Sequence, residues 1–158
     1  MVTLCAFALL LGAMPACSGG NSLSGSISES FDLSFDEVRI RKQDEVLLIE
    51  YIKLLHNGTA KPVKVVLEGR LLVDHAGQRI PLVDGLFVDN DHFAKAVTVS
   101  RIVTTGANFP SIEYGEMGFG DLNFNSLGVV SGHFDVIFNG GRTLTGTFYG
   151  ALQEVDLR

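Results

Sequence analysis

The stretch FDVIFNGGRTLTGTFYG, residues 134–150, decides the fold of this chain. On both sides of a glycine-rich turn, apolar residues recur on one strand face: Phe134, Val136 and Phe138, then Leu144 and Phe148. The turn, Asn139-Gly140-Gly141, accepts the positive φ that a tight hairpin requires. Gly146 and Gly150 leave space beside Phe148, where a large side chain on a neighbouring strand can pack. The stretch therefore predicts a β-hairpin with one apolar and one threonine-rich face.

Alternation with a period of two continues through segments 31–40, 63–67 and 97–103. Within the first of these the phase slips by one residue at Asp36-Glu37, as happens at a bulge or where a strand crosses between sheets. Strands that are short and recur about every 8–12 residues are typical of all-β domains. We predict an antiparallel β-sandwich of about nine strands, with a closed antiparallel β-barrel as the alternative.

Segment 46–55 is the one ambiguous element. It is apolar on both faces, and only Glu50 and Lys53 interrupt it. A helix here would gather the apolar residues on one side, but Asn57-Gly58 follows directly and is a strong hairpin turn. A strand buried between two packed layers also gives a continuous apolar run. We predict a central strand, with a helix as the alternative.

Length and charge limit both the size and the partners of the protein. The chain has 158 residues, enough for one domain of ordinary size. It contains 12 lysines and arginines against 18 acidic residues, and its formal net charge is −6. Without a basic surplus to neutralise phosphates, nucleic acid is not expected as a partner.

The N-terminal region has the composition of an export signal. Val2 to Met14 is apolar apart from Thr3 and Gly12, which is too short to span a bilayer and long enough for a signal-peptide core. The sequence Ala16-Cys17 then closes the run. A small residue before a cysteine at this point resembles the lipobox of bacterial lipoproteins. The resemblance implies cleavage before Cys17, a diacylglycerol on its thiol and an acyl chain on its amine.

This interpretation divides the chain into a signal peptide (1–16), a lipidated cysteine with a Gly/Ser tether (17–22) and one all-β domain (23–158). Cys5 leaves with the signal, so Cys17 is the single cysteine of the mature chain, and neither an internal disulfide nor a cysteine zinc site is expected. In family terms, Ser18 differs from the Asp that resembles an inner-membrane retention signal, so the outer membrane is expected where the cell has one. The alternative is an ordinary signal peptide with Cys17 as a structural thiol.

The polar residues form no recognisable catalytic or metal-binding motif. The four histidines lack the helical spacing of a zinc site, and we interpret them as exposed residues: His56, His75, His92 and His133. Four oxygen-bearing residues share one expected loop but lack the calcium pattern of an EF-hand: Asp84, Asp89, Asn90 and Asp91. No nucleophile elbow or phosphate-binding loop is present. We therefore expect no cofactor and no metal.

Three functional hypotheses follow. The first, which we favour, is a lipid-anchored envelope lipoprotein that acts as a non-catalytic binding or interaction module, bound to the membrane through the lipid on Cys17. The second is a carrier with a β-barrel cavity for a small apolar ligand. The third is an enzyme whose residues come from distant loops, with four candidates: Arg101, Glu113, His133 and Arg142.

Overall fold

The computed structural model describes residues 20–43, 46–68, 79–82, 97–103, 106–107 and 115–154. Within them the chain forms ten strands and one short 3-10 helix, η1: β1 (Ser22–Ser24), η1 (Ser26–Glu29), β2 (Glu37–Gln43), β3 (Val46–Leu55), β4 (Gly58–Glu68), β5 (Ile80–Pro81), β6 (Val97–Val103), β7 (Gly106–Ala107), β8 (Gly115–Phe124), β9 (Val129–Phe138) and β10 (Thr143–Glu154). The all-β prediction is confirmed.

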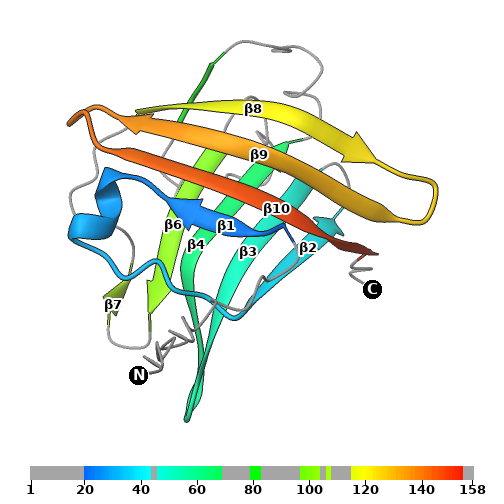
Figure 1. The fold of residues 1–158 in the computed structure, drawn as a ribbon, viewed down its shortest axis with the longest axis horizontal. Coiled ribbons are helices and arrows are strands. Elements are labelled where there is room, and N and C mark those ends of the chain that lie inside the picture. Colours follow the sequence, from blue (N-terminus) through cyan, green and yellow to red (C-terminus); the bar gives the residue numbers. More distant parts are fainter. Residues whose placement is uncertain are drawn as a thin grey trace, which may run out of the picture.

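The strands form one mixed sheet that is barrel-shaped and nearly closed. Its order is β5-β8-β9-β10-β2-β3-β4-β6-β7, and β1 pairs with β10 off this path. A parallel bridge between Leu82 and Val97 links the β5 end of the sheet to β6. In Figure 1, β8, β9 and β10 cross in front of β2, β3, β4 and β6. The architecture is therefore closer to the predicted alternative, a closed barrel, than to the sandwich.

The sheet also departs from the predicted purely antiparallel pairing at one point. The last residues of β10 run parallel to β2, with Leu152 opposite Ile40 and Glu154 opposite Lys42. β10 is 12 residues long, so its first part pairs with β1 and its last part reaches β2. Alternation indicates which face of a strand each side chain lies on, but not which strand is paired with it. This pairing could therefore not be predicted from the alternation.

The hairpin of β9 and β10 has the predicted geometry. Leu144 lies opposite Val136 and Gly146 lies opposite Phe134 in an antiparallel register. A Cβ on Gly146 would overlap the Phe134 ring, so the glycine makes room for a large ring on the neighbouring strand, as predicted. The same kind of contact occurs with the two strands exchanged, because Gly132 on β9 lies against the ring of Phe148 on β10.

Segment 46–55 is a strand, as predicted. β3 pairs antiparallel with β2 on one side and with β4 on the other. Ile49 and Tyr51 belong to the core inside the barrel, so the alternation of a strand turns Glu50 and Ile52 outward. Both outward residues are also buried, which explains why the segment is apolar on both faces.

The alternation in segment 31–35 did not predict its structure correctly. These residues lie outside any strand, and β2 begins only at Glu37. The carboxylate of Asp32 accepts a hydrogen bond from the backbone N–H of Ser34, a local turn that competes with strand pairing. Leu33 is nevertheless buried, and Phe35 packs edge-on against Tyr51 with ring centroids 5.0 Å apart. The apolar residues of this segment thus pack in or against the core although they form no strand.

Large side chains fill the interior of the described barrel. Tyr51, Phe134, Phe148 and Met117 are all fully buried. The Tyr51 hydroxyl donates a 2.7 Å hydrogen bond to the backbone oxygen of Thr147 on β10, which satisfies its polar end. Burial raises the pKa of Tyr51, so the hydroxyl stays protonated. Large rings thus occupy the interior between β3, β9 and β10.

Candidate functional site

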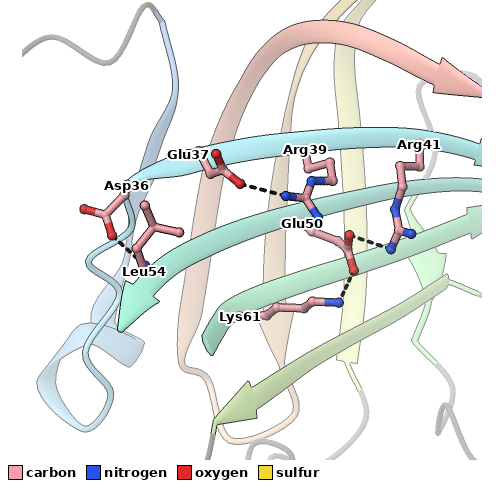
Figure 2. A network of polar contacts seen from close by, with 7 residues as sticks. All are labelled: Asp36, Glu37, Arg39, Arg41, Glu50, Leu54 and Lys61. Atoms are coloured by element: carbon pink, nitrogen blue, oxygen red, sulfur yellow. Dashed lines mark hydrogen bonds and ion pairs between the residues drawn. The ribbon is translucent and has the colours of Figure 1, made fainter. Parts of the chain in front are cut away.

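A buried carboxylate organises the outward face of β2, β3 and β4. Glu50 has no exposed surface, and its two carboxylate oxygens accept hydrogen bonds from different strands. Arg41 Nη2 on β2 lies 2.6 Å from Oε2, and Lys61 Nζ on β4 lies 2.5 Å from Oε1 (Figure 2). We call Glu50 and the four cations around it, Arg39, Arg41, Lys61 and Lys64, the Glu50 cluster.

A β-bulge places Lys61 within reach of Glu50. The pairing of β3 with β4 shifts between Tyr51 and Lys53, so that Ile52 faces two residues, Lys61 and Pro62. Bulges redirect side chains, and proline is accepted there because it has no N–H to donate to the ladder. The irregular pairing thus brings a lysine beside a carboxylate on the neighbouring strand.

The other two cations are cross-strand neighbours of Glu50. Arg39 lies opposite it on β2 and Lys64 lies opposite it on β4. Arg39 Nη2 makes a 2.9 Å ion pair with Glu37, in which both side chains are more than two-fifths exposed. The Lys64 side chain makes no hydrogen bond or ion pair with any residue in the described part of the chain. The cluster therefore contains two fixed cations and two more exposed or unpaired ones.

Electrostatics favour the charged form of Glu50. Burial raises the pKa of Glu50, but the hydrogen bonds and charges of Lys61 and Arg41 outweigh it, and the pKa lies below its usual range. For Lys64, burial lowers the pKa, and the nearby charges of Lys61 and Arg41 lower it further although Glu50 opposes them. The cations around Glu50 therefore carry more positive charge than its one carboxylate neutralises.

The cluster is locally basic on an acidic protein. Its four cations face two carboxylates, Glu50 and Glu37, which leaves two positive charges in excess, whereas the whole chain carries −6. The Nε of Arg41 is buried and has no hydrogen-bond acceptor among the described residues. A buried donor without a partner is costly. An incoming oxyanion would instead meet the exposed part of the Arg41 side chain, which is 30% exposed. The charge of this face suits an anionic group.

A second polar surface lies on the opposite side of the barrel. A shallow pocket there is lined by residues of β8, β9 and β10 and by the start of the described chain: Gly20, Asp121, Ser131, Gly132, His133, Thr147, Phe148 and Tyr149. His133 Nδ1 lies 3.4 Å from the Asp121 carboxylate, and the ring rests on Gly120, where a Cβ would overlap it. The Asp121 side chain is 92% exposed, so this pair is open to solvent.

The residues proposed from the sequence are dispersed. His56 lies in the exposed turn between β3 and β4. The Arg101 guanidinium lies 5.2 Å from the ring centre of Phe31, and Arg142 donates a 2.7 Å hydrogen bond to Ser30 Oγ. His133 is on β9 in the shallow pocket. The remaining proposed residues lie outside the described part of the chain: Cys17, His75, Asp84, Asp89, Asn90, Asp91, His92 and Glu113.

The Glu50 cluster was not predicted, although its signals are present in the sequence. Glu50 interrupts an otherwise apolar strand, and a charged residue in a strand buried on both faces needs partners. Arg39-x-Arg41 places two cations on one face of a strand, and Pro62 within a strand indicates a bulge. To predict that these residues meet, one would have to know that β3 lies between β2 and β4.

Among the described residues no group of three or more histidine, cysteine, aspartate or glutamate side chains could hold a metal ion. The same part of the chain contains no helix of the length and apolarity needed to cross a bilayer. Comparison with protein-family models, curated proteins and solved structures finds no match to this chain.

Proposed function

We propose that the chain is a lipid-anchored, non-catalytic binding module of the bacterial cell envelope. The apolar segment Val2–Met14 and the small residue before Cys17 support the anchor. The observation that carries the binding role is the outward Glu50 cluster, in which four cations face two carboxylates. Gly20, three residues after Cys17, is already bonded to the folded domain.

The bonds at the start of the domain are specific. Thr147 Oγ1 donates a 2.7 Å hydrogen bond to the backbone oxygen of Gly20 and lies 2.8 Å from Ser22 Oγ. The backbone N–H of Tyr149 donates to the Asn21 side chain at 2.5 Å. Three residues of extended chain span about 10 Å. A lipid on Cys17 would therefore hold the barrel close to the bilayer surface.

Binding on the outside of the barrel fits the packing better than carriage of a ligand inside it. A carrier requires interior positions that are too small to fill the barrel. In the described part, interior positions are occupied by fully buried large side chains such as Tyr51, Phe134 and Phe148. The outward Glu50 cluster, by contrast, offers charged groups that its own partners do not neutralise.

The anchor is tested by growing cells with an alkyne analogue of palmitate and fractionating them. We expect the wild-type chain to carry the label and to sediment with membranes. The variant Cys17→Ala should lose both properties. Cys5→Ala is the matched control, because it removes the other cysteine and should remain labelled. An unlabelled wild-type chain in the soluble fraction would contradict the proposal.

The enzyme hypothesis retains one favourable observation, the proximity of His133 to Asp121 in the shallow pocket. Ser131 also lines this pocket, so an imidazole, a carboxylate and a hydroxyl are close to one another. Hydrolysis of a panel of activated esters by the wild-type chain, abolished in His133→Ala and retained in His56→Ala, would support this second candidate function.

A further inference from the structure

We propose that the Glu50 cluster is a docking surface for an acidic segment of a partner protein, in which carboxylates alternate with apolar side chains. The inference rests on the proposed function in one respect, because it supplies the binding surface of the proposed module. The proposed occupant is a protein segment, and the surface that would hold it is formed by described residues of β2, β3, β4 and β6.

Glu50 holds two cations in position before any partner arrives. Arg41 and Lys61 each donate to one of its oxygens, and their side chains are 30% and 25% exposed. A guanidinium has five N–H donors and an ammonium has three, so one hydrogen bond to Glu50 leaves each cation able to bind a second anion. Such fixed donors lose little conformational entropy on binding.

The charge of the surface selects an anionic partner. Lys64 and Arg39 flank Glu50 on either side, and the side chains of Arg41 and Lys61 beside it are partly exposed. Arg39 and Arg41 lie on the same face of β2, about 7 Å apart along the strand. Alternate residues of an extended segment have the same spacing, so successive outward carboxylates of that segment would each meet a cation.

Exposed apolar residues on the same face favour a protein segment over a bare anion. Ile102 on β6 lies opposite Lys61 and is 43% exposed. Leu54 at the end of β3 is 58% exposed. Arginine beside exposed apolar side chains is typical of protein–protein interfaces. A carboxylate-bearing segment with apolar neighbours would use both properties, whereas a phosphate or a lipid headgroup would use only the charge.

The position of the cluster favours a partner beyond the bilayer surface. Gly20 is bonded to β10, and β10 crosses in front of β3 and β4 in Figure 1. The outward face of β3 and β4 therefore points away from β10, the strand to which Gly20 is bonded. An anchored domain would present the Glu50 cluster away from the point where its tether leaves.

The test is fluorescence anisotropy with the full chain purified from its host cells. The probe is a fluorescein-labelled peptide of about ten residues in which glutamate and leucine alternate, about 33 Å long when extended. We expect binding that weakens with added salt, and at least about tenfold weaker binding of the same peptide with glutamine in place of glutamate. Lys64→Gln and Arg39→Gln should each weaken binding about fivefold.

Lys42→Gln is the matched control, because Lys42 is an exposed cation on the same strand as Arg41 but on the opposite face. It should change binding less than twofold. An equal loss in Lys42→Gln would mean general charge attraction and would overturn the proposal. Cluster-dependent binding to phosphatidylglycerol vesicles without peptide binding would identify a headgroup surface, and cluster-dependent dimerisation without peptide binding would identify a second copy as the occupant. Either result overturns the proposal.

The two proposals fail separately. A chain that is not labelled by the palmitate analogue but binds the peptide through Lys64 and Arg39 would remove the anchor and keep the docking surface. A labelled chain that binds none of the probes would keep the anchor and remove the docking surface.

Discussion

Two regions of the sheet are stabilised by different interactions: the hairpin of β9 and β10, and the strands β2, β3 and β4. On the hairpin, glycine on one strand faces a large ring on the next, as Gly146 faces Phe134 and Gly132 faces Phe148. On β2, β3 and β4, a buried carboxylate is surrounded by cations from both neighbouring strands. The first arrangement is held by shape and the second by charge.

The difference determines what each region responds to. Packing of rings against glycine depends on short-range contacts, so it tolerates changes of salt and pH but not added volume. The Glu50 cluster tolerates added volume at its exposed rim but depends on the charge of its members. A surface that must respond to a partner is therefore better built on the Glu50 cluster than on the hairpin.

The largest effect is expected where volume is added at the hairpin. Gly146→Val would drive a branched side chain into the Phe134 ring and toward the Tyr51 hydroxyl. Overpacking of a core typically costs about 1–3 kcal/mol, and this site meets two large neighbours, so we expect a loss of about 3 kcal/mol in the free energy of unfolding. Urea unfolding followed by circular dichroism would measure it.

The control for this change is Gly140→Ala in the turn between β9 and β10. A Cβ on Gly140 meets nothing within 4 Å. Its free energy of unfolding should change by less than about 0.5 kcal/mol. The loss in Gly146→Val should be the same at low and high salt. A strong dependence on salt would contradict the view that shape alone holds this region.

Removal of the central charge of the other region should have the next largest effect. Glu50→Ala leaves Arg41 and Lys61 facing each other without their carboxylate. Loss of one partner of a fully buried ion pair costs about 3–5 kcal/mol, and since these two cations reach solvent we expect about 2 kcal/mol. Urea unfolding again measures the change.

Glu37→Ala is the matched control on the same face. It removes the ion pair with Arg39, in which both side chains are well exposed, and such pairs contribute about 0–1 kcal/mol. We expect a loss below about 0.5 kcal/mol. Equal losses in Glu37→Ala and Glu50→Ala would mean that burial of Glu50 adds nothing to its interactions.

The contribution of Glu50 should also depend on pH. The folded-state pKa of Glu50 lies below its ordinary value, so its stabilisation is fully present above the unfolded pKa of about 4.3. It is lost as the pH falls through the lower folded pKa. The difference in unfolding free energy between the wild type and Glu50→Gln should therefore be constant from pH 7 to pH 5 and shrink below pH 4. A difference that grows on acidification would contradict the assigned direction.

The same contrast explains what could be predicted from the sequence. The hairpin is local, so alternation, Asn139-Gly140-Gly141 and the space at Gly146 sufficed to predict its pairing and its glycine–ring contact. β3 was predicted as a strand because Asn57-Gly58 follows it. The parallel pairing of β10 with β2 joins the two ends of the chain, and alternation carries no information about it.

The Glu50 cluster depends on a different pairing, that of β3 with both β2 and β4. Its cations come from β2 and β4, and Lys61 reaches Glu50 only because of the bulge at Pro62. In segment 31–35, Leu33 is buried, and a local Asp32 turn takes the place of the strand that the alternation predicted. Burial could thus be predicted more reliably than pairing, and the candidate site depends on pairing.

The smallest effect is expected from a change of backbone conformation on β8, the strand that pairs with β9 of the hairpin. Asp121 is the one non-glycine residue with positive φ, at 51°, within the described part of the chain. Glycine adopts this region without steric cost, so Asp121→Gly should raise the free energy of unfolding by about 0.5 kcal/mol, and Asp121→Ala should lower it by a similar amount. Thermal unfolding would resolve the pair of variants because they change stability in opposite directions. If both variants destabilised the protein equally, the contact between Asp121 and His133 would outweigh the backbone, and the hairpin region would then depend on charge as the Glu50 cluster does.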